Sequence, residues 1–293
     1  MRIALTGATG FIGSHVLTEL LQQGREVTAL VRSEAAAEVA AAAGATPAVV
    51  DFYDRAAVVA LLAEADGAIH MASPGDETAA ALDAAVVDAV IEAFAETGRP
   101  YLHTGRVWVY GSNPSIDEAS PFRAPALVAW KEDVERRVLD AAGLRGVVIV
   151  PGVAYGDGGG AIPGLLLGSP RDDAGNLIML GSGRQRWSTV HVADLADLFV
   201  RALADGSARG YYVAADRFNP AVAELTWAAA EAVGAPGAVP GSDEEARARL
   251  GDYFAEVLLL DQATDTAKAR EELGWSPTHQ GLVHELQHGS YRR

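Results

Sequence analysis

The most informative absence in this sequence is cysteine, because none of the 293 residues is a cysteine. Without thiols the chain cannot form disulfide bridges, zinc sites with thiolate ligands or iron–sulfur clusters. It also has no cysteine nucleophile. These kinds of site, and the protein classes that depend on them, are therefore excluded.

Positive charge is scarce as well, since 23 lysine and arginine residues stand against 39 acidic residues and leave a net charge of −16. Binding to nucleic acid or to an anionic membrane surface depends on clustered Lys and Arg side chains. We therefore expect no nucleic-acid partner and no membrane partner held by bulk electrostatics.

Long hydrophobic runs are missing too. No run of roughly 18 apolar residues is present, so we expect no transmembrane helix. The N-terminal segment turns glycine-rich at Gly7 and lacks the apolar stretch of about 7–15 residues that a secretory signal needs. Both absences predict a cytoplasmic protein. The hydrophobic share of 49% is ample for a large core.

What the first half of the chain does have is an alternation of short apolar runs and helical patterns. Strands are predicted at 2–6, 26–31, 46–50, 67–71, 100–104 and 145–150. Helices are predicted at 11–23, 34–43, 55–65, 78–96 and 126–142. Six βα units in succession indicate an α/β fold, a doubly wound parallel sheet with helices on both faces.

A glycine triplet stands between the first predicted strand and the first predicted helix, with the spacing G-x-x-G-x-x-G. Glycine lets backbone N–H groups approach a pyrophosphate, and the N-terminus of the helix favours the negative charge. This position in a strand–turn–helix unit predicts a dinucleotide-binding loop. The loop residues expected to bind the cofactor are Gly7, Thr9, Gly10, Phe11, Ile12 and Gly13.

The loop and five further segments together resemble the short-chain dehydrogenase/reductase superfamily, in the extended or atypical branch that includes the NAD-dependent epimerases and dehydratases. The segments are TGATGFIG (6–13), AIHMAS (68–73), HTGRVWVYG (103–111), PGVAYG (151–156), VHVADLA (190–196) and KAREELGWSP (268–277). The resemblance implies a nicotinamide cofactor. It places Met71, Ala72, Ser73, Pro151 and Val153 in the cofactor site.

The domain organisation follows from the same patterns. After Pro151 the βα alternation loosens, with helices predicted at 192–204 and 225–233 and a strand at 211–214. We expect a Rossmann dinucleotide-binding domain at 1–160, to which 190–216 return. A smaller substrate-binding lobe should occupy most of 161–293, with the cleft above the carboxyl ends of the strands.

The cofactor preference is predicted from the end of the second strand, where no acid stands between Val27 and Ser33. An acid here usually holds the ribose 2′-OH of NAD, whereas the guanidinium of Arg32 suits a 2′-phosphate. We predict NADPH, with NADH as the second choice; the alternative is that Arg32 is an ordinary surface residue. Ser33 joins this cofactor site, and the resemblance makes Asp51 and Phe52 an adenine-contacting pair.

The catalytic motif of the superfamily is incomplete in this chain. The resemblance implies Tyr-x-x-x-Lys, in which the tyrosine moves a proton at the carbinol oxygen and the lysine binds the nicotinamide ribose. Lys131 stands at the lysine position, but Leu127 stands at the tyrosine position. No tyrosine occurs between Tyr110 and Tyr155.

The upstream serine of the motif, expected near Gly105 and Arg106, is absent as well. Thr104 is the nearest hydroxyl and is expected to orient the carbonyl. The predicted catalytic residues are therefore Thr104 and Lys131. Any proton would come from the substrate or from water.

Three functions remain open at this point. The first is a ketoreductase that works without the tyrosine, at a cost of about 10²–10⁴ in rate unless the substrate offsets it. A resemblance to atypical ketoreductases of aromatic-polyketide antibiotic pathways, which also lack the tyrosine, favours an aromatic polyketide-like ketone. The second is a non-catalytic NADP(H)-binding regulator. The third is a nucleotide-sugar epimerase or dehydratase, since Arg184 or Arg186 could hold a sugar-nucleotide phosphate.

Aromatic residues gather in the segments expected near the nicotinamide, and they predict a pocket for a planar ligand unless each ring simply packs in the core. These residues are Trp108, Tyr110, Trp130, Tyr155 and Trp187. The residues expected to bind substrate are Ser73, Gly105, Arg106, Trp108, Leu127, Tyr155, Arg186 and Trp187. The oligomeric state stays open between a monomer and a homodimer.

A possible zinc signature lies near the C-terminus, where 284–288 read H-E-L-Q-H. On a helix this spacing places two histidines on one face with a glutamate as base. The chain continues for only five more residues, which leaves no downstream third ligand. We interpret the segment as a surface helix and expect no metal.

Overall fold

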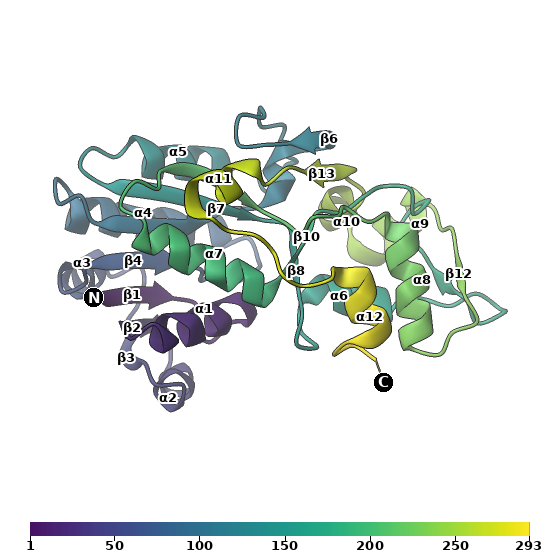
Figure 1. Cartoon of the computed structure of the whole chain (residues 1–293), viewed down its shortest axis with the longest axis horizontal. Helices are drawn as coiled ribbons and strands as arrows, with labels where there is room; N and C mark the ends of the chain where they lie inside the picture. The colour runs from purple at the N-terminus through teal and green to yellow at the C-terminus, as the bar shows by residue number, and fades with distance from the viewer. Residues whose placement is uncertain (293) are drawn as a thin grey trace.

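Seven parallel strands form the main sheet of the computed structural model, which describes residues 1–292 (Figure 1). Their order across the sheet is β11-β7-β5-β4-β1-β2-β3. The strands are β1 (Arg2–Thr6), β2 (Glu26–Val31), β3 (Thr46–Val49), β4 (Gly67–His70), β5 (Pro100–Thr104), β7 (Arg145–Pro151) and β11 (Gly210–Ala214). The expected α/β fold with a doubly wound parallel sheet is confirmed.

Helices cover both faces of this sheet because alternate strand residues point to opposite sides. On one face Ile3 and Leu5 pack with α1 (Phe11–Gln22), α2 (Glu34–Ala42) and α7 (Val192–Ala204). On the other face Ala4 packs with α3 (Arg55–Ala63), α4 (Ala79–Phe94) and α5 (Lys131–Asp140). Strands buried on both sides explain the uninterrupted apolar runs of the sequence.

Helix α5 is where the predicted boundaries fail. The expected helix at 126–142 begins only at Lys131, after a turn over 126–130. Val128 N donates to Pro125 O at 3.0 Å, and Lys131 N donates to Val128 O at 3.0 Å. These i→i+3 bonds wind the segment more tightly than an α-helix. Leu127 therefore lies in a turn before the helix and is 38% exposed.

The second lobe is built from short elements around a separate core that includes Tyr155, Leu225 and Leu286. Its helices are α6 (Ala161–Leu167), α8 (Val222–Ala232), α9 (Asp243–Leu250), α10 (Asp252–Leu258) and α12 (Leu282–His288). Two small parallel sheets join β8 (Val153–Tyr155) to β10 (Thr189–His191) and β9 (Leu177–Ile178) to β12 (Ala238–Val239). Most of these short elements were absent from the sequence prediction.

The boundary between the lobes is crossed several times. β11 and α7 belong to the main sheet and its covering layer. The chain also returns after the second lobe: β13 (Gln262–Thr264) pairs with β6 (Asn113–Ile116), and α11 (Ala267–Leu273) packs beside β11 and α7. Trp275 is fully buried in the main core. Besides the expected return of 190–216, residues 262–277 thus also lie against the main domain.

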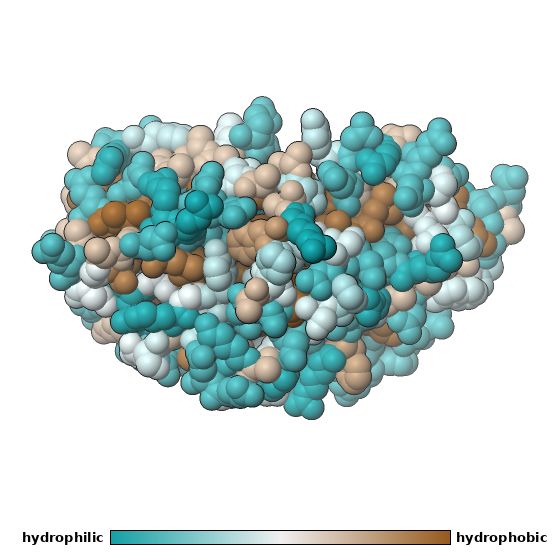
Figure 2. All heavy atoms as spheres, turned by 90° about the horizontal axis from the view of Figure 1, so that it is seen from above, coloured by the Kyte–Doolittle hydropathy of each residue, from teal (hydrophilic) through white to brown (hydrophobic). Residues whose placement is uncertain are grey.

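Over residues 1–292 no helix combines the length and apolar character needed to span a bilayer. Figure 2 shows hydrophilic residues over most of the face seen from above, with apolar residues in smaller areas between them.

Candidate active site

A cavity of about 450 Å³ opens at the carboxyl ends of β1, β4, β5 and β7. The strand order reverses beside β1, and ligands of doubly wound folds bind at this kind of switch point. Gly160, Ala161 and Ile162, at the start of α6, complete the wall from the second lobe. The site thus lies where the two lobes meet.

The glycine loop forms one wall of the cavity and fits a dinucleotide. Gly7 has φ +73°, and a Cβ there would lie 2.7 Å from Ala72 N. A Cβ on Gly13 would lie 1.9 Å from Gly7 O. Helix α1 begins after Gly10 without a side-chain cap, which leaves N–H groups of its first turn for an anion. Only glycine permits this close cradle, and the cradle suits a diphosphate.

The structure divides the predicted cofactor residues into two groups. One group lines the cavity: Gly7, Gly10, Phe11, Ile12, Gly13, Met71, Ala72, Ser73, Lys131, Pro151 and Val153. The other group lies outside it: Thr9, Arg32, Ser33, Asp51 and Phe52.

The residues outside the cavity have other surroundings. Arg32 is exposed at the end of β2. The hydroxyl of Ser33 caps α2 by accepting from Ala36 N at 3.3 Å. The Asp51 carboxylate accepts from Tyr53 N at 2.9 Å. The Phe52 side chain is buried in the core between the sheet and helices α3 and α4, so any contact with adenine would fall to its backbone.

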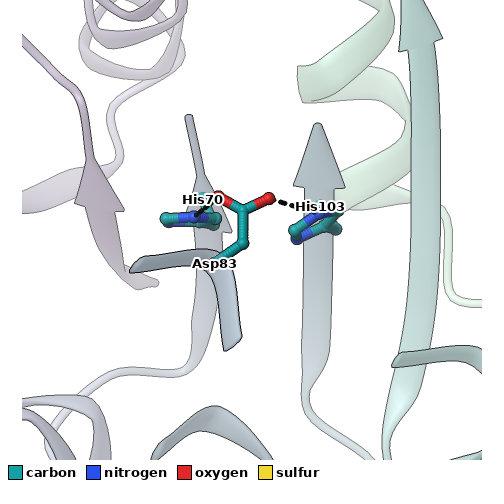
Figure 3. Close-up of side chains that lie close together, drawn as sticks. All are labelled: His70, Asp83 and His103. Carbon is teal, nitrogen blue, oxygen red and sulfur yellow. Dashed lines mark hydrogen bonds and ion pairs between the residues drawn. The ribbon is translucent and has the colours of Figure 1, made fainter. Parts of the chain in front are cut away.

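Beneath the cavity lies a buried group of four side chains, His70, Asp83, His103 and Lys131, which we call the Asp83 cluster. Figure 3 shows Asp83 between the two histidines. Asp83 Oδ1 lies 3.1 Å from His70 Nε2, and Asp83 Oδ2 lies 3.3 Å from His103 Nε2. Lys131 Nζ donates to Asp83 Oδ2 at 2.9 Å. One carboxylate of α4 thus joins β4, β5 and α5.

The electrostatics of the Asp83 cluster keep the carboxylate charged. Burial alone would raise the pKa of Asp83, but its contacts with His103 and His70 and the charge of Lys131 hold that pKa well below its usual range. Burial lowers the pKa of His103 to about 4, against the opposing influence of Asp83. His103 is therefore neutral at pH 7, and the charges of Lys131 and Asp83 balance.

The two predicted catalytic residues, Thr104 and Lys131, are brought together in the cavity wall. Lys131 Nζ also donates to Thr104 O at 3.0 Å, so one of its three N–H bonds remains for a ligand. Thr104 Oγ1 donates its only proton to His70 O at 2.7 Å. In this arrangement the hydroxyl offers a ligand its lone pairs, and the expected role of Thr104 in orienting a carbonyl stays a prediction.

Arg106 is the other cation in the cavity wall. Its Nη2 donates to Ser73 Oγ at 3.3 Å, and its guanidinium carbon lies 5.7 Å from the centroid of the Trp108 ring. Gly105, Ser73 and Trp108 line the cavity with it, as expected. No ion pair within residues 1–292 includes Arg106.

Four predicted substrate residues do not line the cavity: Leu127, Tyr155, Arg186 and Trp187. Tyr155 and Trp187 are buried in the core of the second lobe, where Trp187 Nε1 donates to Leu258 O at 3.0 Å. Arg186 is held by Asp261 through two bonds of 2.9 Å. Of the aromatic residues expected to form a pocket, Trp108 alone lines the cavity.

Glu135 is a second buried acid near Lys131, one helical turn further along α5. Its side chain is fully buried, and neither carboxyl oxygen has a hydrogen-bond partner among the described residues. Burial raises the pKa of Glu135 to about 7, while the charge of Lys131 opposes this shift. A Cβ on Gly105 would lie 3.0 Å from Glu135 Oε1, so this acid packs directly behind the cavity wall.

A second group of similar composition, His191, Asp194 and His279, lies at the start of α7, and we call it the Asp194 cluster. The two imidazole rings stack 3.5 Å apart with an interplanar angle of 6°. His279 Nδ1 lies 2.9 Å from Asp194 Oδ2. In the C-terminal helix the Glu285 carboxylate accepts from the backbone and hydroxyl of Ser290.

The sequence interpretation missed His70, Asp83 and Glu135. The only available signal was an acid at an apolar position: Asp83 follows Leu82 within an Ala-rich helix that is buried along one side. Acidic residues are almost never fully buried unless paired. The partners of Asp83 come from three other elements, and nothing in the local sequence identifies them.

Comparison with known proteins agrees with this geometry. The model of the NAD dependent epimerase/dehydratase family matches residues 3–215. An uncharacterized protein of Schizosaccharomyces pombe is 32% identical over 297 residues, which cover 99% of this chain and 100% of the relative. The 4-hydroxy-2-methyl-3-oxo-4-farnesyl-3,4-dihydroquinoline-1-oxide ketoreductase of Stigmatella aurantiaca is 28% identical over 328 residues, covering 96% and 94%.

A solved structure with the same fold is that of the human epimerase family protein SDR39U1, isoform 2, crystallised with NADPH. It superposes with a TM-score of 0.78 over the whole of both chains, at 21% identity. The family description confirms the expected nicotinamide cofactor class. With the match over residues 3–215 and the 32% identity over nearly the full length, the chain belongs to the NAD dependent epimerase/dehydratase family.

Proposed function

We propose that the protein is an NADPH-dependent ketoreductase acting on small aromatic ketones of the polyketide type. The observation that carries the proposal is that the glycine cradle and the two cations Lys131 and Arg106 line one cavity, to which no tyrosine of residues 1–292 contributes. The ketoreductase activity named for the Stigmatella relative supports it. An epimerase or dehydratase of the family is the competing assignment.

In such a reaction the cavity residues would have different roles. The glycine loop would hold the cofactor diphosphate, and Lys131 would use its remaining N–H on the nicotinamide ribose or the carbonyl oxygen. The nicotinamide supplies the hydride when bound. Water or a phenol of the substrate would supply the proton, since no tyrosine lines the cavity among residues 1–292.

NADPH consumption with a panel of aromatic ketones tests the reaction. We expect turnover by the wild type and a loss of at least about 10² in kcat/KM for Lys131→Met, because the cavity then loses its remaining N–H donor and its ammonium charge. Arg217→Gln is the matched control, since Arg217 is exposed and, among the described residues, forms a hydrogen bond only with Ser276. Cofactor binding without any turnover would favour a regulator. Turnover of a nucleotide sugar with NAD would favour an epimerase or dehydratase.

The preference for NADPH is tested at Arg32. A guanidinium that holds a 2′-phosphate contributes a charge-assisted hydrogen bond of about 1.5–3 kcal/mol. Arg32→Gln should therefore weaken NADPH binding by about tenfold or more while leaving the Kd of NADH unchanged. Calorimetric titration with both cofactors measures this. Equal changes for the two cofactors, or tighter binding of NADH by the wild type, would contradict the assignment.

A further inference from the structure

The cavity wall carries more positive than negative charge although the whole chain has a net charge of −16. Among the described residues, the charged side chains that line the cavity are Asp83, Lys131 and Arg106. The ion pair between Asp83 and Lys131 neutralises two of these charges. Arg106 is left as a cation without a counter-ion.

The guanidinium of Arg106 is held in place without being neutralised. Ser73 Oγ accepts from one of its nitrogens at 3.3 Å, and the Trp108 ring lies 5.7 Å from its central carbon. A guanidinium has five N–H donors in a fixed planar fork, and only one has an acceptor here. Burial lowers the pKa of Arg106, and the charge of Asp83 opposes this shift.

Two features fix the backbone that carries Arg106. Gly105 packs against Glu135 and Val148 so closely that a Cβ would lie 3.0 Å from Glu135 Oε1 and 3.1 Å from Val148 Cγ1. Gly105 N donates to Ile149 O at 2.7 Å. Arg106 therefore extends into the cavity from a rigid strand end, in the segment where the superfamily resemblance implies a catalytic serine.

We propose that the substrate of this cavity is an organic anion, a carbonyl compound that carries a carboxylate, and that Arg106 binds the carboxylate. Planar carboxylates match the guanidinium fork in a bidentate geometry. An aromatic body would contact the Trp108 ring. This proposal names the substrate class of the ketoreductase proposed above, and it rests on that function for the reaction but not for the binding of the anion.

The reaction on such a substrate leaves the carboxylate unchanged. The carbonyl carbon accepts the hydride, the π electrons of the C=O bond move to oxygen, and the resulting alkoxide takes a proton from water. One oxo acid, one reduced cofactor and one proton thus give one hydroxy acid and one oxidised cofactor. The pairing with Arg106 persists through this change and positions the carbonyl.

Binding of benzoate and of benzamide, which have the same shape but different charge, tests the anion site directly. Titration calorimetry on the full chain, with and without NADP⁺, should give at least about tenfold tighter binding of benzoate. Arg106→Gln should abolish this preference, Arg106→Lys should retain part of it, and the matched control Arg217→Gln should leave it unchanged. Equal affinity for the two ligands in the wild type would overturn the proposal.

Two further outcomes distinguish the proposed anion site from a cofactor-binding role of Arg106 and from the proposed ketoreductase activity. If Arg106→Gln weakens NADPH binding but leaves the preference for benzoate, Arg106 serves the cofactor and the proposal is overturned. Turnover of phenylglyoxylate against its methyl ester is measured in parallel, with at least about tenfold higher kcat/KM expected for the acid. A preference for benzoate without turnover of either compound would support the anion site and contradict the ketoreductase.

Discussion

The Asp83 cluster and the Asp194 cluster both combine two histidines with one aspartate, but they differ in what neutralises the carboxylate. Asp83 is buried and receives an ammonium, with Lys131 Nζ at 2.9 Å. Asp194 receives hydrogen bonds instead, from the backbone and hydroxyl of Thr278 and from the backbone and ring of His279. One cluster supports the cavity, and the other ties the C-terminal segment to α7.

The difference shows why three ligand-type residues within reach of one another do not define a metal site. In the Asp83 cluster a lysine already provides the cation at the carboxylate. In the Asp194 cluster His279 Nδ1 already contacts Asp194 Oδ2 at 2.9 Å, and His191 Nδ1 already accepts from Ala193 N at 3.2 Å. The same composition thus serves an internal ion pair in one region and a tether in the other.

The largest expected effect comes from removing the cation of the Asp83 cluster. Lys131→Met leaves the buried Asp83 carboxylate without its ammonium partner, and we expect the free energy of unfolding to fall by about 3–5 kcal/mol. The double variant Asp83→Asn, Lys131→Met should recover most of this loss, because neither charge remains buried. Urea denaturation measures both. A loss under about 1 kcal/mol for Lys131→Met would show that the pair is not desolvated.

The next largest expected effect is the contribution of His103, in the Asp83 cluster, to the pH dependence of stability. Because burial lowers the folded-state pKa of His103 to about 4 from an unfolded value near 6.5, its contribution is complete above pH 6.5. That contribution, about 3 kcal/mol, is lost as the pH falls through 4. Urea denaturation of His103→Gln between pH 7 and 4 should show a correspondingly smaller loss than the wild type.

The test of His103 needs a control, because two buried acids change the stability with pH in the opposite direction. Burial raises the pKa of Glu135 and of Asp216 to about 7. The stability that each acid contributes is therefore complete below the pKa of that acid in the unfolded chain, and it is lost as the pH rises through 7. Tyr101→Phe removes the hydroxyl that lies 3.1 Å from His103 Nδ1 but keeps the imidazole. It should therefore retain the acid loss, and equal slopes for Tyr101→Phe and His103→Gln would contradict the assignment.

The sequence alone predicted the features that depend on residues close to one another in the chain. The main strands lie within one or two residues of their predicted ends, and the glycine loop lines the cavity as expected, because periodicity and turn glycines are local signals. The lysine position of the motif also places Lys131 correctly in the cavity wall. These features need no knowledge of the rest of the molecule.

What the sequence could not reveal depends on distant contacts and on the direction of single bonds. Whether Thr104 donates to a ligand or to His70 O is decided by the strand beside it. Tyr155 and Trp187 are aromatic residues near the site in the chain, but the core of the second lobe buries both. The two- and three-residue strands β8, β9, β10 and β12 are too short to show any period.

The smallest expected effect is in the Asp194 cluster, where hydrogen bonds from Thr278 and His279, and no lysine, surround the carboxylate. Burial alone would raise the pKa of Asp194, yet the bonds from His279 and Thr278 hold it below its usual value, so these bonds stabilise the fold above the unfolded pKa. Asp194→Asn keeps one acceptor oxygen and loses the charge. We expect a loss of about 1–2 kcal/mol at pH 7, less than for Lys131→Met.

In the wild type Trp275 Nε1 also donates to Asp194 O, and the variant retains this backbone contact. Limited proteolysis should therefore cut the variant after the buried Trp275, within the segment that the carboxylate holds, before it cuts the main sheet. Unchanged cleavage together with unchanged stability would show that the Asp194 cluster is not a tether.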